Sequence, residues 1–215
     1  MVALVSVSSV SLVIVLSYLV YRVCLNPKPS SPQPSTLTPG DGDTESVTPS
    51  DLNIEDLKVE DVLVRGRYSE VRRGHLGEQE VAVKIYQPHH RQYYYNERNA
   101  FTLPFMDHDN VVKFFGAREQ EDMGSNLPQY LVVTEYIPLG SLTGYLKHNT
   151  LDWYTLCHMC QGVARGLAHL HTDITKGALF KPALAHRDLN TRNILVKPDL
   201  TCVLADLGFA VGMVG

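Results

Sequence analysis

Five side chains in four short segments have the chemical types that phosphate transfer requires. The segment VAVK ends in Lys84, and Glu97 follows thirteen residues later. HRDLNTRN contributes Asp188 and Asn193, and ADLG contributes Asp206. Carboxylate and amide oxygens are ligands that magnesium prefers, and an ammonium group neutralises phosphate charge. Because phosphate transfer needs charge neutralisation and alignment more than covalent help, this is the chemistry that the set would suit.

Each segment taken alone has a plainer explanation. A single lysine at a strand end is usually solvated, and a single Asp-x-Gly is usually a turn. All four segments, in this order and at these intervals, match the protein-kinase signature set. On these motifs, residues 57–215 resemble the first half to two-thirds of a protein kinase catalytic domain. The resemblance implies an α+β, bilobal protein kinase fold, truncated in the C-lobe.

The resemblance also implies a role for each of the five side chains. Lys84 would hold the α- and β-phosphates of ATP, and Glu97 would pair with Lys84 and fix its direction. Asn193 and Asp206 would hold the metal ion, Mg²⁺ or Mn²⁺. Asp188 would be the catalytic residue that orients the substrate hydroxyl and accepts its proton.

Further residues would bind the nucleotide if the resemblance holds. Thr134 precedes the connector EYIPLG and would form the floor of the adenine pocket. Backbone groups near Glu135 and Ile137 would meet the base. The remaining ATP-binding residues that the resemblance implies are Val64, Gly66, Val71 and Ala82.

The glycine-rich loop departs from the kinase pattern. Aligning Val71 with the final valine of G-x-G-x-x-G-x-V places Val64, Gly66 and Ser69 at the three glycine positions. Only the middle glycine remains. Since glycine lets the backbone approach phosphates closely, we expect a looser phosphate cover and weaker nucleotide binding, with no effect on the fold.

The elements that would position these residues follow from the patterning. Alternation and β-branched content predict strands in VEDVLVRGRYSEVRRGHL, QEVAVKIY, VVKFFGA and QYLVVTEY. A helix is expected over HHRQYYYNERNAF, after Pro88. A mostly β lobe would thus come first, followed by a connector and a helical lobe.

An amphipathic helix is predicted to begin just after Asp152, which is placed to cap it. Its apolar stripe recurs at helical spacing and consists of Trp153, Leu156, Cys160, Val163, Leu167 and Leu170. Cys157 and Cys160, three residues apart, also suit one metal ion. No second Cys-x-x-C or histidine pair follows at ligand spacing, so we expect Cys160 to pack in the core instead.

The first residues of the chain have the composition of a membrane anchor. Residues 2–21 carry no charge, and twelve of these twenty are Val, Leu or Ile, enough to cross a bilayer as a helix. Arg22 and Lys28 follow, which places the C-terminal part in the cytosol. A cleaved signal peptide is the alternative, but its basic start and small-residue exit are missing. We expect a single-pass protein of the cell membrane with a cytoplasmic kinase domain.

The predicted organisation is a transmembrane helix over 1–25, a disordered Pro/Ser juxtamembrane linker over 26–55 and the kinase domain over 56–215. Six of the twelve prolines lie within 26–51, a composition that cannot bury enough apolar surface to fold. Cys24 is either a palmitoylation site or a plain interfacial cysteine. The net charge of −4 gives no argument for nucleic-acid binding, and four scattered cysteines suit a reducing compartment.

Wider stretches resemble type II receptors of the TGF-β superfamily. They are FKPALAHRDLNTRNILVKPDLTCVLADLG, RGRYSEV, NERNAFTLPFMDHDNVVKF and GSLTGYL. ADLGFA and the two missing glycines favour the anti-Müllerian hormone branch, while HRDLNTRN favours the bone morphogenetic protein branch; we prefer the former. The resemblance implies a transmembrane receptor serine/threonine kinase whose substrate and partner is a type I receptor serine/threonine kinase, which in turn phosphorylates Smad proteins.

Two parts of such a receptor are not expected here. The ligand-binding ectodomain is absent from this chain, since one residue precedes the apolar segment. The activation segment and later helices beyond Gly208 are absent too, so the stripe of the amphipathic helix should be exposed and phosphate transfer poor or absent. The alternative function is a truncated, catalytically inactive, membrane-anchored module that binds partner receptors and modulates signalling.

Overall fold

The computed structural model describes residues 54–121 and 127–213 of the chain. These residues belong to one compact unit. The transmembrane helix predicted over 1–25, and nearly all of the linker predicted over 26–55, lie outside the described residues. Within the described ranges, no helix is both long and apolar enough to cross a membrane.

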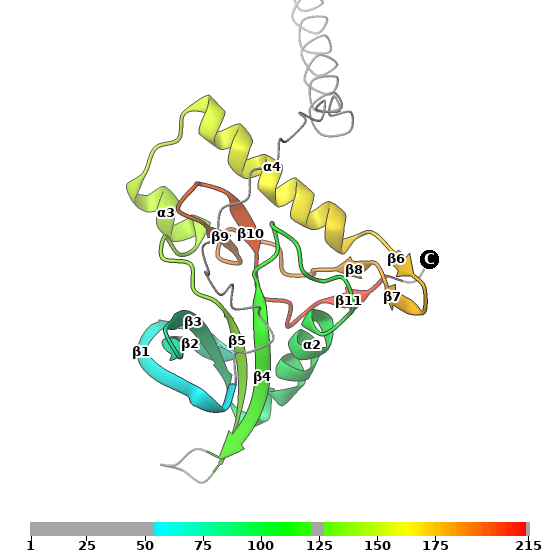
Figure 1. The fold of residues 1–215 in the computed structure, drawn as a ribbon. Helices are drawn as coiled ribbons and strands as arrows, with labels where there is room; N and C mark the ends of the chain where they lie inside the picture. Colours follow the sequence, from blue (N-terminus) through cyan, green and yellow to red (C-terminus); the bar gives the residue numbers. More distant parts are fainter. Residues whose placement is uncertain (1–53, 122–126, 214–215) are drawn as a thin grey trace, which may run out of the picture. The chain divides into compact units, whose positions relative to one another are not determined.

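A five-stranded antiparallel sheet forms the N-terminal lobe (Figure 1). It follows a single 3-10 turn, η3 (Ile54–Asp56). The strands lie in the order β1-β2-β3-β5-β4, and their bounds are β1 (Leu57–Arg65), β2 (Ser69–Leu76), β3 (Gln79–Tyr86), β4 (Phe114–Glu121) and β5 (Pro128–Glu135). The predicted strands are therefore present, and the α+β class is confirmed.

The two faces of this sheet bury different residues. Val81, Val83 and Ile85 of β3 are at most 5% exposed and pack on one face with Leu131 and Val133 of β5. Successive side chains of a strand point to opposite faces, so the residues between them on β3 lie on the other face, toward the rest of the domain. This second face positions the candidate site.

Helix α2 (Arg91–Phe101) follows the short η4 turn (Pro88–His90), as the sequence predicts. It buries Tyr94, Glu97, Ala100 and Phe101. The Phe101 ring stacks on Phe114 of β4, with ring centroids 5.1 Å apart. The buried apolar residues of α2 join the larger hydrophobic core, which continues into the second lobe.

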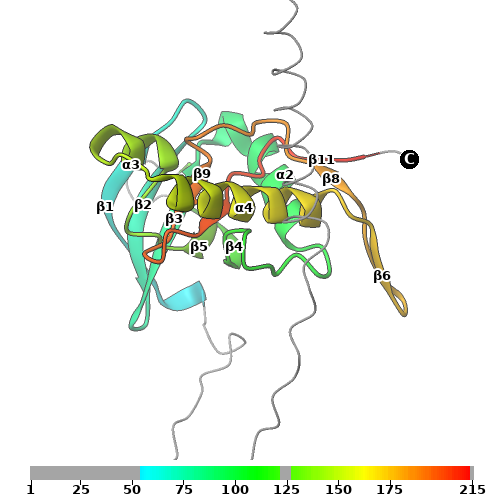
Figure 2. The same cartoon turned by 90° about the horizontal axis from the view of Figure 1, so that it is seen from above.

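The second lobe contains α3 (Leu142–His148) and the long helix α4 (Trp153–Leu170), which crosses the molecule in the view of Figure 2. The predicted cap of α4 is confirmed, because the Asp152 carboxylate accepts a hydrogen bond of 2.7 Å from the Thr155 amide. Gly162 and Gly166 let α4 approach its neighbours closely. A Cβ on Gly166 would lie 2.5 Å from the carbonyl oxygen of Asn110.

The predicted stripe of α4 packs on the core only in its C-terminal half. Leu170 is buried, and Val163 and Leu167 pack against the core. Trp153 and Leu156 are 72% and 40% exposed, as expected for the stripe. Cys160 is exposed, so the prediction that it packs in the core is wrong. The physical reason is that α4 makes its closest backbone contacts through Gly162 and Gly166, which share the buried face with Met159 and Leu170, and Cys160 lies outside that face.

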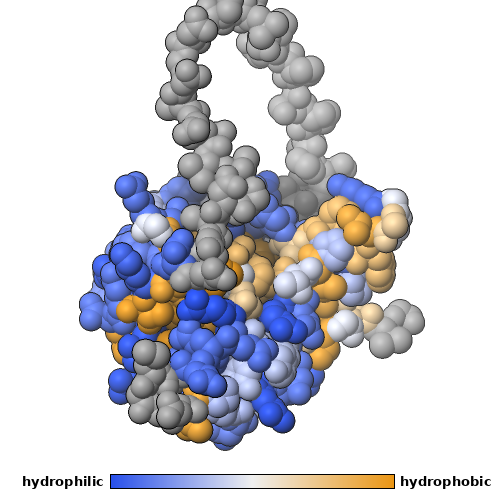
Figure 3. Space-filling view, turned by 60° about the horizontal axis from the view of Figure 1, so that its bottom comes forward, coloured by the Kyte–Doolittle hydropathy of each residue, from blue (hydrophilic) through white to orange (hydrophobic). Residues whose placement is uncertain are grey.

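Three short hairpins or strand pairs complete the lobe. They are β6 (Ile174–Lys176) with β7 (Leu179–Lys181), β8 (Leu184–Ala185) with β11 (Val211–Gly212), and β9 (Ile194–Val196) with β10 (Cys202–Leu204). Apolar side chains are exposed on β7 and β11, and hydrophobic surface is visible on the right of Figure 3.

A fully buried lysine joins these strands to α4. The Lys181 ammonium, which has three N–H donors, lies within 2.9–3.3 Å of four carbonyl oxygens, those of His169, Leu170, Thr172 and Pro182. Carbonyl groups at the end of a helix have no partner within the helix. Lys181 therefore caps the C-terminus of α4 and fixes the segment that leads into HRDLNTRN.

Candidate active site

Five of the predicted nucleotide-binding residues lie on the same face of the sheet. Ala82 and Lys84 alternate on β3, Val71 of β2 is paired with Lys84, and Val64 of β1 is paired with Val71. Thr134 of β5 is paired with Ala82. Directly paired residues of an antiparallel sheet point to the same side. The register therefore gathers these five side chains over one surface.

Three more of the predicted nucleotide-binding residues lie at loops and strand ends, and the ninth, Glu97, lies on α2. Gly66 is in the turn between β1 and β2, where its amide donates to the Ser69 carbonyl at 2.8 Å. Glu135 ends β5, and its carboxylate pairs with the Lys197 ammonium at 3.0 Å. Ile137 follows β5 and is 5% exposed.

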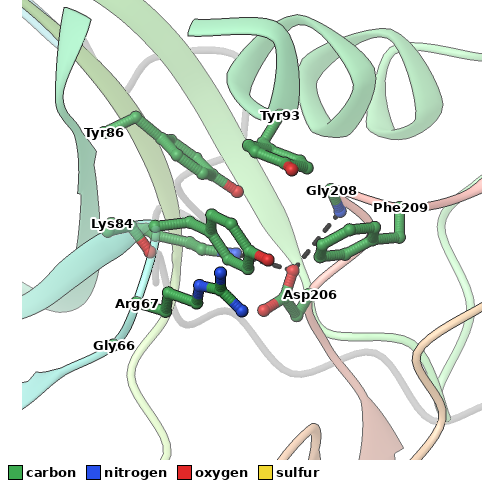
Figure 4. Close-up of a pocket in the computed structure, with 10 residues that line it drawn as sticks. Gly66, Arg67, Lys84, Tyr86, Tyr93, Asp206, Gly208 and Phe209 are labelled. Atoms are coloured by element: carbon green, nitrogen blue, oxygen red, sulfur yellow. Dashed lines mark hydrogen bonds and ion pairs between the residues drawn. The ribbon is translucent and has the colours of Figure 1, made fainter. Parts of the chain in front are cut away.

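Lys84 joins the two lobes through two carboxylates. Its ammonium nitrogen lies 3.1 Å from Glu97 Oε2 of α2 and 2.8 Å from Asp206 Oδ1 of the ADLG segment. Figure 4 shows Lys84 and Asp206 in contact where both line a pocket. Side chains that are far apart in the sequence therefore meet at one point, as the kinase resemblance implies.

The electrostatics of this triad favour the charged forms of Lys84 and Asp206. Burial alone would lower the pKa of Lys84, but the nearby charges of Glu97 and Asp206 raise it well above its usual value. Burial would raise the pKa of Asp206, but the Lys84 ammonium and the Gly208 amide lower it overall. Burial raises the pKa of Glu97, and Lys84 opposes this shift. The Lys84–Asp206 contact is thus an ion pair.

The Glu97 carboxylate is buried and accepts hydrogen bonds from three groups. Besides Lys84, the Tyr86 hydroxyl donates to Oε2 at 2.6 Å and the Leu207 amide donates to Oε1 at 3.0 Å. Sequence reasoning missed Tyr86. The available signal was the strand alternation, which puts Tyr86 on the same face as Lys84, two residues earlier.

The segment HRDLNTRN holds the Asp188 side chain between two amides. Asn193 Nδ2 donates to Asp188 Oδ2 at 2.9 Å, and Asn190 Nδ2 donates to Oδ1 at 3.2 Å. Sequence reasoning gave Asn190 no role. The backbone of Asn193 accepts a hydrogen bond of 2.9 Å from the Ala205 amide, directly before Asp206. Asp188, Asn193 and Asp206 thus belong to one connected group.

Two non-glycine residues of this group have strained backbones. Arg187 has φ of 65° and Asp206 has φ of 64°, in the left-handed region. Such conformations are unfavourable for residues with a Cβ and concentrate at functional sites. Asp206 itself, and the residue directly before Asp188, therefore have a backbone conformation that is typical of such sites.

The pocket beside Lys84 suits a magnesium-bound phosphate group (Figure 4). It is lined by Gly66, Arg67, Tyr68, Ser69, Lys84, Tyr86, Tyr93, Asp206, Gly208 and Phe209. The donor set fits Mg²⁺, since the Asp206 carboxylate and the Asn193 amide both offer hard oxygen ligands. The Lys84 ammonium supplies the positive charge that a phosphate requires.

Residues 57–214 match the family described as protein tyrosine and serine/threonine kinase. The chain belongs to this protein kinase family. The N-terminal sheet, α2 and the group around Asp188 are thus parts of a kinase domain. The sequence also resembles receptors of one group. Activin receptor type-2B of Xenopus laevis is 37% identical over 220 residues, which cover 97% of this chain and 40% of that receptor.

Two further relatives agree with this similarity. Activin receptor type-2A of Gallus gallus is 35% identical over 221 residues, covering 97% of this chain and 40% of that receptor. Activin receptor type-2A of Homo sapiens is 39% identical over 163 residues, covering 74% of this chain and 31% of that receptor. The chain therefore spans at most 40% of the length of these relatives.

Two residues with side chains, Val64 and Ser69, stand where the kinase pattern has glycine in the loop between β1 and β2. Val64 is 56% exposed on β1, and Ser69 begins β2, paired with Tyr86. The ring of Tyr68, at the tip of this turn, packs against Tyr93 of α2 and Phe209, with centroids 4.5 and 5.5 Å away. These aromatic contacts connect the loop to α2 and to the segment after Gly208.

Proposed function

We propose that the protein is a receptor serine/threonine kinase that transfers the γ-phosphate of ATP to a Ser or Thr hydroxyl of a type I receptor of the TGF-β superfamily. The observation that carries the proposal is the contact of 2.8 Å between Lys84 and Asp206, which both line the pocket. A cation from the sheet and a metal-ligating carboxylate from the second lobe meet where phosphates would bind. Kinase family membership supports the same conclusion.

Each predicted residue has a role in this proposal. Lys84 binds the α- and β-phosphates, and Glu97 keeps its ammonium directed into the pocket. Asp188, held by Asn190 and Asn193, accepts the proton of the substrate hydroxyl. Val64, Val71, Ala82 and Thr134 form the surface for adenine, and the backbone near Glu135 and Ile137 binds its edge.

Asn193 and Asp206 would hold the magnesium ion. When bound, this ion neutralises charge on the transferred phosphate. Because Asp206 Oδ1 is paired with Lys84 in the described structure, Oδ2 is the oxygen left for the metal. The side-chain nitrogen of Asn193, Nδ2, donates hydrogen bonds to Asp188. The side-chain oxygen of Asn193 is left for the same ion.

The cellular part of the proposal follows from the sequence. The apolar segment over 2–21 anchors the chain in the membrane, with the kinase domain in the cytoplasm. The relatives are named activin receptors, which supports a place in TGF-β superfamily signalling with a type I receptor as partner. The anti-Müllerian hormone branch stays a prediction, since the relatives above are activin receptors type-2.

Phosphate transfer is tested directly with the full chain in a mild detergent. Purified protein is incubated with ATP, Mg²⁺ and the cytoplasmic part of a type I receptor, and phosphoserine and phosphothreonine are measured by mass spectrometry. Thermal unfolding with and without ATP–Mg²⁺ reports binding, because a ligand of the native state raises Tm. Lys84→Met and Asp188→Asn are the test variants, and Lys113→Met, at an exposed position of the same lobe, is the matched control.

Any transfer by the wild type, which the sequence predicts to be poor, should persist in Lys113→Met and be lost in Asp188→Asn and Lys84→Met. Asp188→Asn should retain the Tm increase with ATP–Mg²⁺, whereas Lys84→Met should lose it. No increase in any protein would contradict a nucleotide site. An increase without transfer would favour the alternative function of a non-catalytic module that binds partner receptors.

A further inference from the structure

The pocket contains a second cation that no kinase motif explains. Arg67 lies in the turn between β1 and β2 and lines the pocket together with Lys84 and Asp206. Its guanidinium points into the pocket toward Asp206 (Figure 4). The group lies 5.4 Å from the centroid of the Tyr68 ring, which supports its position.

Lys84 does not have its full charge available for a phosphate. It is shared between Glu97 and Asp206, at 3.1 and 2.8 Å. The formal charges of Lys84, Glu97 and Asp206 sum to −1, and adding Arg67 brings the sum to zero. A nucleoside triphosphate is itself strongly negative, so a pocket without Arg67 would meet it with a net negative charge before the metal ion is counted.

Arg67 is free to bind a ligand. Among the residues that the structure describes, it has no ion-pair partner within 4.0 Å. Arg65, two residues earlier, differs from Arg67 both in its ion pairing and in its position relative to the pocket. Its guanidinium pairs with Glu70 at 3.5 Å, and the residue does not line the pocket.

The same loop lacks two of the glycines that bring backbone amides close to phosphates. Val64 and Ser69 occupy those positions, and a side chain keeps the backbone farther from a ligand. A guanidinium reaches farther than an amide, and its planar donors match two phosphate oxygens at once. A guanidinium at this position is therefore suited to the contact that the backbone gives in a glycine-rich loop.

We propose that Arg67 binds the β- and γ-phosphates of the nucleotide and makes the site selective for a triphosphate. The inference rests on the proposed function, because it needs a nucleotide in this pocket. It adds a specificity-determining residue outside the motifs, and it assigns the loop a charged contact in place of a glycine contact.

The test compares Arg67→Gln with Arg65→Gln in the full chain. Calorimetry measures the Kd of ATP–Mg²⁺, ADP–Mg²⁺ and adenosine for the wild type and both variants, and Tm without ligand verifies folding. Charge-assisted bidentate contacts are strong, so we expect Arg67→Gln to weaken ATP binding about tenfold and ADP binding less. Adenosine binding should not change. Arg65→Gln should match the wild type with all three ligands.

The outcomes separate this inference from the proposed function. If the wild type binds ATP–Mg²⁺ and Arg67→Gln binds it equally well, the role of Arg67 is refuted while the nucleotide site stands. If Arg67→Gln weakens adenosine and ATP alike, the residue shapes the loop without contacting phosphate, and the inference is again overturned. If the wild type binds none of the three ligands, the proposed function fails, and this inference fails with it.

Discussion

The hydroxyl of Tyr86 should contribute measurably to stability through a single hydrogen bond. Tyr86→Phe removes that hydroxyl and keeps the ring. The lost bond is 2.6 Å long and joins two side chains that are 1% and 2% exposed. A hydrogen bond to a charged group contributes about 1.5–3 kcal/mol. We therefore expect the free energy of unfolding to fall by about 2 kcal/mol, which lowers Tm by about 4–8 °C in a domain of this size.

The control for this prediction is Tyr93→Phe. Tyr93 lines the same pocket, but within the described part of the chain no hydrogen bond of its hydroxyl is present. Thermal unfolding of both variants, followed by far-UV circular dichroism without nucleotide, should show a lower Tm for Tyr86→Phe alone. Equal Tm values for the two variants would refute the reasoning, because they would mean that the hydrogen bond from Tyr86 to Glu97 does not stabilise the folded protein.

Two other predictions concern helix α4 and its surroundings. Alanine usually stabilises a helix relative to glycine by about 1 kcal/mol; Gly144→Ala in α3, where a Cβ would meet nothing closer than 3.6 Å, should raise Tm, whereas Gly166→Ala should lower it because its Cβ would lie 2.5 Å from a carbonyl oxygen. An increase for both would show that α4 shifts freely. The His108 and His169 rings stack 4.4 Å apart, and burial is the main cause that lowers both pKa values below 6.5. Asp107 and Asp109 oppose the shift at His108, and Arg165 and Lys181 add to the shifts at His108 and His169 respectively. As the pH falls, the two histidines therefore take up protons in the unfolded chain before they do so in the folded protein. Their contribution to stability is present above pH 6.5 and is lost as the pH falls through the folded pKa values. Tm between pH 8 and pH 5 should fall less in His169→Phe than in the wild type, and parallel curves would contradict this linkage.

The sequence predicts the sheet better than its exact limits. Alternation in QEVAVKIY and QYLVVTEY locates β3 and β5 almost to the residue. The strand expected from Val111 begins only at Phe114. Val112 instead bonds to the Leu204 carbonyl, at 2.9 Å, and is buried in the core between the lobes. Apolar β-branched residues are common both in strands and in a hydrophobic core. Composition alone therefore does not reveal that β4 begins after Val111 and Val112.

The candidate site is predicted where a motif fixes both residue type and spacing. Lys84, Glu97 and Asp206 meet as the kinase resemblance implies. Tyr86 and Asn190 are different, because their contacts depend on which side chain the fold places beside a carboxylate. Similarly, the face of α4 depends on close backbone approach at glycine, and a count of apolar residues does not measure that approach.

The lysine cap at the end of α4 makes the catalytic loop sensitive to a distant substitution. Lys181 contacts neither nucleotide nor substrate in the proposed mechanism, yet seven residues later the chain reaches Asp188. Replacing it would remove this buried donor from the carbonyl groups at the end of α4, and the segment that Lys181 restrains would be held less firmly. A mutational survey that scores only phosphate transfer would then record Lys181 among the catalytic positions, although its defect is one of scaffolding.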